Sequence, residues 1–237
     1  MAPFWQSLTP TPEPPLFLPD LQALPPFDLA IEVFQGGDLK RLRLSVSVVN
    51  HGPGALELLG VSDFSTRSTL VTQHIDTRDG TRLEFPVGSF IFHTAHNHWH
   101  LEDFATYDLW SLTRSGGLKD LVASNTKVSF CLRDLRQSDP AVTSADAAYT
   151  ACERELQGLS TGWVDTYRSH LPGQHINISE VPDGLYAVRV TFDPLNYLLE
   201  MEEYNNSAWV TVAISGGDVR LIDDWASLKL QLDTRLR

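Results

Sequence analysis

Apolar and polar residues alternate along most of this chain, which is the spacing of half-buried β-strands. The segment RLRLSVSVVN (41–50) shows the alternation most clearly, and a turn cluster, NHGPG (50–54), ends it. Eight further segments are short and rich in β-branched and aromatic residues: 55–60, 81–87, 89–100, 105–112, 127–134, 175–181, 185–193 and 208–215. Short strands separated by frequent turns predict an all-β fold, a β-sandwich with long loops.

Two segments depart from this pattern. One window, SADAAYTACERELQG (144–158), has a helical composition, so we expect at most one short helix. Residues 1–27 hold eight of the 14 prolines, and proline lacks the backbone donor that a helix or an internal strand needs. We therefore expect a proline-rich arm over residues 1–17, partly docked, and one domain over residues 18–237.

The composition excludes two classes of partner. A formal charge of −12 and a pI near 5.0 argue against nucleic-acid binding, which needs basic patches to neutralise phosphates. No run approaches the roughly 20 apolar residues of a membrane span. The N-terminus shows no basic segment followed by an apolar one, so no secretory signal is visible. The chain is then either cytoplasmic or the processed form of an exported protein.

Four of the eight histidines lie in HTAHNHWH (93–100). Residues two apart on a strand share one face, so His96, His98 and His100 should project to the same side. Imidazole nitrogens suit copper, zinc, nickel or iron, and three such ligands leave coordination positions open, as catalytic sites do. The alternative is a chance surface tract of histidines, which the core-like neighbours Phe92 and Trp99 argue against.

Two neighbours of this run admit other interpretations. His93 lies at an odd spacing from His96, so a regular strand places it on the opposite face. It either forms a hydrogen bond or a substrate contact near the metal, or is an ordinary buried histidine. His96, His98 and Glu102 also fit the cupin pattern, H-x-H followed by Glu. The later cupin element is matched only by PGQH, which ends at His175 and has the wrong spacing. A cupin-type protein binding iron, manganese or zinc is the second hypothesis.

The histidine run is one of four motifs that resemble the lysyl oxidase family. HTAHNHWHLEDFATYDL (93–109) is similar to that family's copper-binding segment, W-H-x-x-H-x-H-x-H followed by a Phe and Y-D-L. KVSFCLRD (127–134) resembles K-A-S-F-C-L-E-D, and GLSTGWVDTY (158–167) resembles G-L-S-P-G-x-x-D-T-Y. HINISEVPDGLYAVRVTFDPLNYLL (175–199) resembles the strand pair that follows. The motifs keep their order over residues 18–215, which is far more specific than the histidines alone.

The resemblance implies a copper amine oxidase whose second cofactor is lysine tyrosylquinone, a cross-link between a lysine and a tyrosine of the protein itself. The matching positions are Lys127 and Tyr167, and Asp165 of the D-T-Y motif is the expected catalytic base. The same three histidines match the copper ligands. The implied reaction uses molecular oxygen to convert primary amines, on protein lysines or small molecules, to aldehydes with release of ammonia and hydrogen peroxide. The family also implies an extracytoplasmic protein, secreted or periplasmic.

A second candidate cation site lies in LLEMEEYNNS (198–207), where carboxylate and amide side chains gather. Oxygen ligands of these kinds suit calcium. The segment resembles the family's E-x-D-x-x-N-N calcium element, which an Asp-Leu pair near the domain start completes, the leucine through its carbonyl. The expected ligands are Asp20, Leu21, Glu200, Glu202, Asn205 and Asn206, with Glu202 in place of the aspartate. The alternative is a solvated acidic turn.

The two cysteines, Cys131 and Cys152, either form one bridge or remain two buried thiols. Besides the amine oxidase and the cupin-type metalloprotein, a third hypothesis is a non-catalytic metal-binding β-domain that keeps the motifs without the cofactor. The sequence is compatible with protein lysines and with small amines as substrates.

Overall fold

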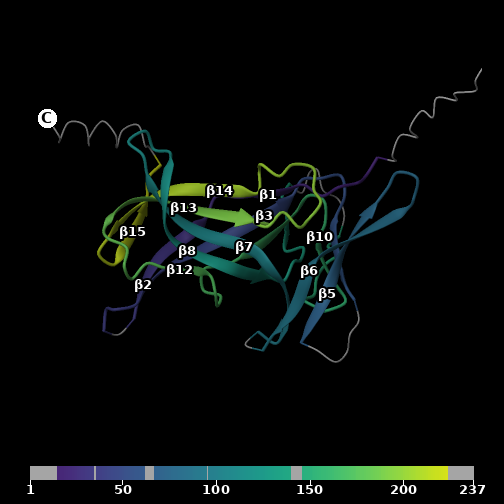
Figure 1. Cartoon of the computed structure of the whole chain (residues 1–237), viewed down its shortest axis with the longest axis horizontal. Coiled ribbons are helices and arrows are strands. Elements are labelled where there is room, and N and C mark those ends of the chain that lie inside the picture. The colour runs from purple at the N-terminus through teal and green to yellow at the C-terminus, as the bar shows by residue number, and fades with distance from the viewer. Residues whose placement is uncertain (1–14, 35, 62–66, 95, 140–145, 224–237) are drawn as a thin grey trace, which may run out of the picture.

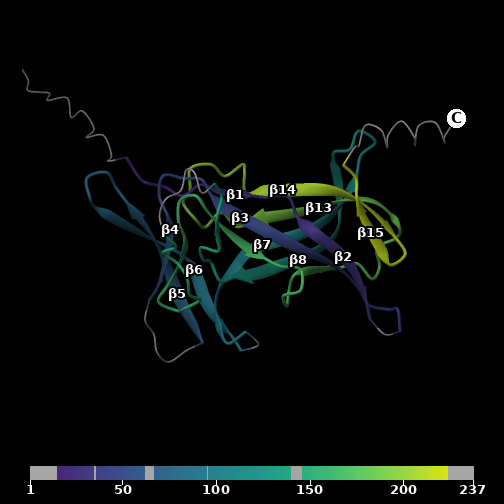
Figure 2. The same cartoon turned by 180° about the vertical axis from the view of Figure 1, so that it is seen from behind.

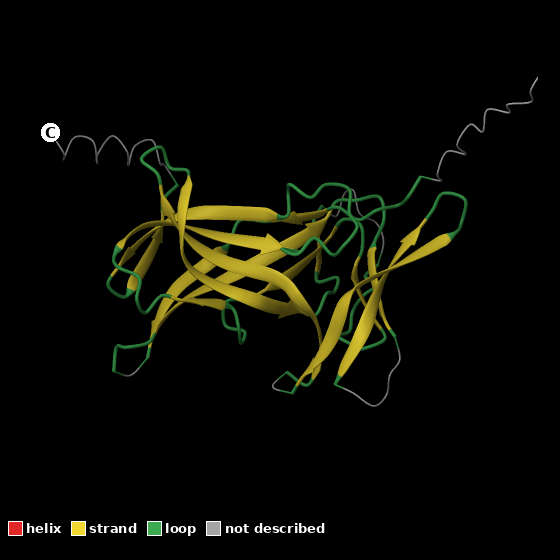
Figure 3. Ribbon diagram, viewed as in Figure 1, coloured by secondary structure: helices red, strands yellow, loops and turns green. Residues whose placement is uncertain are grey.

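The computed structural model describes residues 15–34, 36–61, 67–94, 96–139 and 146–223, and for Lys127 it describes the backbone alone. These residues form strands and loops without a helix (Figure 3). The all-β prediction is therefore confirmed. It also follows that no helix in the described ranges is long and apolar enough to cross a membrane.

The short helix expected over residues 144–158 is wrong for the described part of that window. Residues 146–155 are a loop, and Leu156–Leu159 form strand β10, which pairs antiparallel with β4 (Leu56–Gly60). Gln157 and Leu159 are fully buried in this pairing. Burial against a neighbouring strand outweighs the small differences in helix propensity that favoured a helix here.

The described strands form two antiparallel sheets that pack on one another (Figures 1 and 2). The smaller sheet has the order β1-β3-β11-β9, with β2 and β12 also paired to β3. The larger has the order β10-β4-β5-β6-β7-β13-β14-β15, with β8 paired to β7. The remaining bounds are β1 (Leu21–Ala23), β2 (Phe27–Val33), β3 (Lys40–Asn50), β5 (Ser68–Asp76), β6 (Arg82–His93), β7 (His98–Leu112), β8 (Leu118–Phe130), β9 (Arg136–Gln137), β11 (Trp163–Tyr167), β12 (His175–Asn177), β13 (Gly184–Phe192), β14 (Ser207–Ser215) and β15 (Asp218–Leu221).

Strand β3 is the centre of the smaller sheet and carries the alternation seen in the sequence. Its apolar residues Leu42, Leu44, Val46 and Val48 are fully buried. They join one hydrophobic core with side chains of β7 and β13 from the larger sheet. A core shared by two sheet faces is the sandwich that the sequence predicts.

Strand β7 changes partners along its length, and this change positions the candidate site. Residues 98–101 pair with β6, whereas residues 105–111 pair with β13. Between these segments Asp103 adopts a φ of 52°, a left-handed conformation that interrupts a regular strand. The β5–β6 hairpin consequently diverges from β13 and β14, as Figure 1 shows. The histidine run lies where β6 ends and β7 begins, in the part of the sheet that diverges from β13 and β14.

The described end of the proline-rich arm contacts the domain. Leu16 forms an isolated antiparallel bridge with Thr77, and the Phe17 amide donates to the Asp76 carbonyl at 2.9 Å. These contacts agree with a partly docked arm. Residues 1–14, which make up most of the arm, and residues 224–237 lie outside the described residues.

Candidate metal and quinone site

The histidine run forms a β-hairpin instead of one continuous strand. β6 ends at His93 and β7 begins at His98, and these two residues pair across the hairpin. The His93 carbonyl accepts hydrogen bonds from the amides of His96 (3.0 Å) and Asn97 (2.8 Å). Asn97 has a φ of 57°, a left-handed conformation that asparagine adopts more readily than most residues. The expectation of a single strand is therefore right for His98 and His100 and wrong for His96, which lies in the turn.

The hairpin brings four imidazole rings together, and we call His93, His96, His98 and His100 the histidine cluster. His100 lies at its centre: ring centroids are 4.4 Å from His93, 5.0 Å from His96 and 4.7 Å from His98. His93 is thus part of the cluster and not on an opposite face, because it belongs to the neighbouring strand β6. One ring nitrogen from each of His93, His96 and His100 lies within 4.8 Å of the others, a spacing that can hold a metal ion.

The electrostatics of the cluster favour neutral rings. Burial, with a smaller contribution from the neighbouring histidines, lowers the pKa of His100 to about 3. Burial also lowers the pKa of His96 and of His98, and the Arg133 guanidinium contributes to the lowering at His98. Neutral imidazoles have a free nitrogen lone pair, which is the form that binds transition metals. The donor set is therefore ready for a metal that prefers nitrogen.

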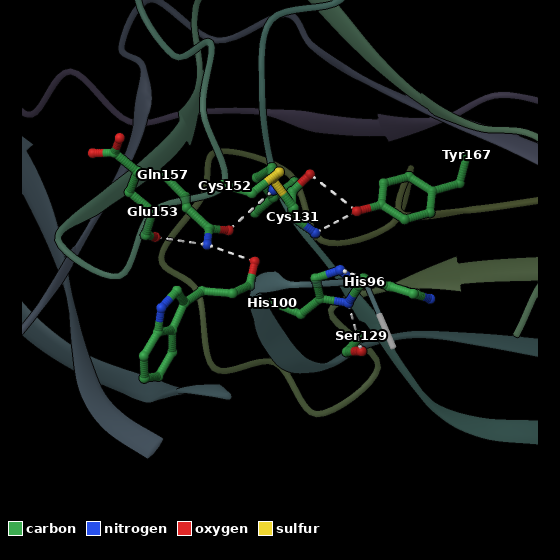
Figure 4. The surroundings of a disulfide bond; sticks show 10 residues. His96, His100, Ser129, Cys131, Cys152, Glu153, Gln157 and Tyr167 are labelled. Atoms are coloured by element: carbon green, nitrogen blue, oxygen red, sulfur yellow. Dashed lines mark hydrogen bonds between the residues drawn. A yellow bond between two sulfur atoms is a disulfide. The ribbon is translucent and has the colours of Figure 1, made fainter. Parts of the chain in front are cut away.

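Ser129 on β8 connects two rings of the cluster. Its hydroxyl lies 3.0 Å from His100 Nδ1, as Figure 4 shows, and 3.1 Å from His93 Nε2. His100 Nε2 instead points toward His96, with 3.3 Å between it and His96 Nδ1. A hydrogen bond from Nδ1 to a neighbouring group fixes the ring orientation and leaves Nε2 for a metal.

Tyr167 lies beside the cluster at the end of β11, where it pairs with Val46 of β3. Its ring packs on Phe130 with 3.9 Å between centroids, and lies 6.4 Å from the His100 ring. The hydroxyl donates to the Cys131 carbonyl at 3.2 Å and accepts from the Cys131 amide. Burial raises the pKa of this phenol far above its ordinary value, and Asp165 adds to the effect.

Cys131 and Cys152 form a disulfide, which decides between the two expectations for these residues. The bridge ties the end of β8 to the loop before β10, next to the Tyr167 hydroxyl (Figure 4). Gln157 holds the same loop, because its side-chain amide donates to the carbonyls of Trp99 and Glu153, each at 3.0 Å. The wall of the site opposite the histidines is therefore covalently fixed.

Asp165, two residues before Tyr167 on β11, is fully buried. No hydrogen bond of ordinary geometry reaches either carboxylate oxygen from the described residues, although the backbone amides of Thr166 and Arg133 lie near enough to lower the pKa of Asp165. Burial raises the pKa of Asp165 to about 8, even though the Arg133 guanidinium acts in the opposite direction. A carboxyl group with a pKa near neutrality and free oxygens is suited to accept a proton.

Lys127 is placed by its backbone in β8, between Thr126 and Val128, and its side chain lies outside the described part of the chain. The nearby residues Asn125, Val128 and Ser129 all line a cavity that reaches Tyr167. The strand that carries Lys127 therefore borders the same space as the tyrosine.

Two cavities of about 280 Å³ each flank the cluster and share His96, His100, Tyr167 and Pro172. The Ser129 cavity lies toward β8 and also includes His93. The Arg133 cavity lies toward β11 and the disulfide, and is also lined by His98, Arg133, Cys152 and Asp165. A small molecule can therefore approach the tyrosine and the histidines from two sides.

The predicted calcium residues converge at the far end of β1, although Glu202 is exposed. The Glu200 carboxylate accepts from the Leu21 amide at 2.9 Å and from Asn206 Nδ2 at 2.6 Å. Asn205 Nδ2 donates to Asp20 Oδ1 at 2.9 Å. Leu21 thus contacts Glu200 through its amide in this conformation.

Several oxygens of this site lack partners. The side-chain carbonyls of Asn205 and Asn206 and one carboxylate oxygen of Glu203 are buried without a hydrogen bond in the described residues. Burial raises the pKa of Glu200 to about 8, and it raises the pKa of Glu203 as well. Unpaired oxygens, and carboxyl groups whose pKa is raised by burial, are what a bound cation would relieve, so the donor set fits calcium.

Sequence reasoning missed three residues: Ser129, Arg133 and Glu203. Ser129 and Arg133 lie inside KVSFCLRD, so the motif contained a signal for both. Glu203 adjoins the predicted Glu202, and only the structure distinguishes which one turns inward. This geometry does not support the cupin hypothesis, because the group of possible metal ligands among the described residues includes neither Glu102 nor His175.

Comparisons with known proteins agree with these motifs. The lysyl oxidase family model matches residues 69–223. Protein-lysine 6-oxidase of Gallus gallus is 37% identical over 126 residues, and that of Homo sapiens is 35% identical; each match covers 52% of this chain and 27% of the relative. Lysyl oxidase homolog 1 of Homo sapiens is 33% identical over 132 residues, covering 55% of this chain and 21% of the relative. The chain therefore spans about a quarter of the length of these curated relatives. The family match covers more than half of the chain, and the chain belongs to the lysyl oxidase family.

Proposed function

We propose that this chain is a copper- and quinone-dependent oxidase of primary amines, which forms aldehydes, ammonia and hydrogen peroxide from amines and molecular oxygen. The observation that carries the proposal is the placement of Tyr167, whose partly buried ring lies 6.4 Å from His100 and borders both cavities. When bound, copper and the quinone would supply the exchange of electrons between amine and oxygen.

The proposed copper ligands are His96, His98 and His100. Their neutral rings suit a nitrogen-preferring metal. The three histidines whose ring nitrogens lie within 4.8 Å of one another are His93, His96 and His100, so His98 enters the proposed set through the family motif and its 4.7 Å ring contact with His100. His93 is proposed to orient His100 through Ser129 and not to bind the metal itself. In this arrangement His100 Nδ1 donates to the Ser129 hydroxyl, which donates to His93 Nε2. This chain of hydrogen bonds holds the His100 ring with Nε2 directed at the metal.

Tyr167 and Lys127 are proposed to form the quinone cross-link. The Cys131 backbone holds the Tyr167 hydroxyl, and Phe130 holds the ring face, so the tyrosine is fixed before any modification. Asp165 is proposed to take the proton from the carbon that bears the amine. Its raised pKa and free oxygens make it a stronger base than an ordinary aspartate.

The carboxylate and amide cluster is proposed to bind calcium through Asp20, Leu21, Glu200, Asn205 and Asn206, with one carboxylate of the Glu202–Glu203 pair. The buried, unpaired oxygens of this cluster support the proposal. Calcium would join β1 to the loop before β14 and would play a structural part, since none of these residues lines either cavity.

The expected location is extracytoplasmic, in the periplasm or outside the cell. The Cys131–Cys152 bridge supports this proposal, because disulfides persist in oxidising compartments.

The decisive experiment is peptide mass spectrometry on protein expressed with copper and exposed to air. We expect a peptide that contains both Lys127 and Tyr167 joined through their side chains. Lys127→Arg and Tyr167→Phe should each remove it. Lys119→Arg is the matched control, because Lys119 lies on the same strand but lines neither cavity. Its ammonium forms an ion pair with Asp120, with 2.8 Å between the nitrogen and the carboxylate oxygen. Absence of the cross-link in copper-loaded, aerated protein would overturn the proposal.

A further inference from the structure

Arg133 presents a guanidinium without a partner to the Arg133 cavity. The side chain is half-buried, directly after β8, and no other described residue forms a hydrogen bond or an ion pair with it. Asp165 lines the same cavity, yet the two side chains form no ion pair within 4.0 Å. Arginine is rarely left half-buried and unpaired, because its charge is costly to remove from water.

The rest of the cavity differs in character from Arg133. Asp165 and Tyr167 form its reactive end; Asp165 is fully buried and Tyr167 is partly buried. Leu135, Leu171 and the disulfide line the space as well, and these surfaces are apolar. A ligand that fills the cavity would therefore place a reactive group at Tyr167, an aliphatic segment along the apolar wall and an acceptor at Arg133.

We propose that the preferred substrates are primary amines that carry a carboxylate at the end of an aliphatic chain, and that Arg133 binds this carboxylate. The proposal rests on the proposed amine oxidase function and names its substrate class. The planar guanidinium matches a carboxylate with two parallel hydrogen bonds, which is the strongest pairing open to arginine. The amine at the other end of the chain then reaches Tyr167 and Asp165.

The charges of the lining residues argue for a single carboxylate. Arg133 is the one lysine or arginine among the described residues that line this cavity. One cation balances one carboxylate, whereas a phosphate dianion would call for further donors. A diamine would bring a second positive charge next to the guanidinium, and like charges at short range repel.

The test compares three amines of one length that differ only at the far end: ε-aminocaproate, hexylamine and hexamethylenediamine. Binding is measured by calorimetry in the Tyr167→Phe background, so that no amine is consumed, and turnover is measured as peroxide formation in the otherwise native protein. We expect ε-aminocaproate to bind roughly 10- to 100-fold more tightly than hexylamine, as a charge-assisted pairing would give. Hexamethylenediamine should bind most weakly.

Substitutions of Arg133 should change this selectivity in a defined order. Arg133→Gln should bring the affinity ratio of ε-aminocaproate to hexylamine close to unity, and Arg133→Lys should restore part of it. Arg133→Glu should invert the preference toward hexamethylenediamine. Arg220→Gln on β15 is the matched control, because it removes the same charge from an exposed position outside both cavities. Its ratio should equal that of the native protein.

The outcomes separate this inference from the function on which it rests. The inference would be overturned if the affinity ratio of ε-aminocaproate to hexylamine were near unity in the native protein. It would also be overturned if Arg133→Gln left this ratio unchanged, or if Arg220→Gln lowered it equally. If Arg133 acted only by tuning Asp165, all three amines would change together and the ratio would stay constant, which also overturns it. Arg133-dependent binding without peroxide from any amine would instead overturn the proposed oxidase and leave the carboxylate site standing.

Discussion

Two buried carboxyl groups, Asp165 and Glu200, have the same raised pKa of about 8 and opposite surroundings. In both, burial is the main cause. Asp165 accepts no side-chain hydrogen bond among the described residues and borders the Arg133 cavity. Glu200 accepts hydrogen bonds from the Leu21 amide and from Asn206, and borders neither of the two cavities at the histidine cluster.

The difference shows that a raised pKa identifies a carboxyl group whose ionised form is destabilised, but does not identify the role of that group. A carboxyl with free oxygens beside a cavity can exchange a proton with a bound molecule. A carboxyl held by neighbours and surrounded by unpaired amide oxygens is arranged to bind a cation. The contacts, more than the pKa, therefore assign Asp165 to chemistry and Glu200 to stability.

Replacement of Asp165 should have the largest effect on activity. Asp165→Asn removes the proposed base, and we expect amine turnover to fall roughly 10²- to 10⁴-fold. Stability should be preserved or should rise, because the variant removes a buried carboxyl that has no partner. Peroxide assays and thermal unfolding measure the two effects.

Glu200→Gln is the matched control for this comparison. It should leave most of the turnover intact and lower stability in the presence of calcium. The pH profile gives a second check, since native turnover should decline about tenfold per pH unit below the Asp165 pKa of about 8. Equal activity losses in the two variants would remove the distinction between the carboxyl groups.

Loss of the disulfide should weaken the region around Asp165 and leave the region around Glu200 unchanged. Replacing both Cys131 and Cys152 by alanine releases a loop with a sequence separation of 21. Loop-closure entropy predicts a fall of about 3 kcal/mol in the free energy of unfolding. Denaturant unfolding measures it.

Calcium should still stabilise the double alanine variant as much as it stabilises the native protein. A lost calcium response would show that the two regions are coupled and would contradict their independence. Leu135→Ala, a change at an exposed leucine near the bridge, controls for local packing and should cost far less.

Calcium should stabilise the protein more strongly at alkaline pH. The Glu200 pKa is raised on folding, so the native state binds more protons than the unfolded state above the ordinary glutamate pKa. The stability from this group is fully present below that ordinary value and is lost as the pH rises through about 8. Calcium binds the ionised carboxylate, and at a hundred times its dissociation constant it contributes about 2.7 kcal/mol.

Thermal unfolding with calcium or with a chelator, at about pH 6 and about pH 9, tests the predicted direction of this pH dependence. The calcium-induced rise in Tm should be larger at the higher pH and should be lost in Glu200→Gln. Glu203→Gln should reduce it more than Glu202→Gln, because Glu203 has the buried carboxylate oxygen. A larger response at the lower pH would argue against Glu200 as a ligand.

Ser129→Ala should have the smallest effect, on copper affinity. Loss of the hydroxyl removes the hydrogen bond to His100 Nδ1, and changes of this kind typically weaken metal binding about tenfold. Competition with a chromophoric copper chelator measures the affinity. His93→Ala should give a similar loss, and His98→Ala a larger one. If His93→Ala costs more than His98→Ala, His93 is itself a ligand.

The sequence predicted the sandwich because alternation records which face of a strand is buried, as β3 illustrates with its four buried apolar residues. The predicted helix was wrong for the described part of residues 144–158, where β10 pairs with β4. The strand prediction also failed at His96, because the turn depends on backbone hydrogen bonds to His93 that no side-chain pattern records.

The candidate site shows a similar limit. Tyr167 and Asp165 were predictable from one motif, since both lie on β11. Their approach to the histidine cluster was not, because β11 and the β6–β7 hairpin belong to different sheets. The motif KVSFCLRD contains Ser129 and Arg133, but their roles depend on what their side chains face, which is decided by tertiary packing.

Pairing of β11 with β3 has a consequence for the order of events during folding. Tyr167 aligns with Val46, and the Leu21 amide reaches Glu200 across 179 positions of the chain. Contacts between such distant segments form late, and proteins rich in them fold slowly. Tyr167 meets the strand of Lys127 only after both sheets have assembled. A cross-link between them could therefore form only in molecules that have reached the native topology, and it would mark those molecules covalently.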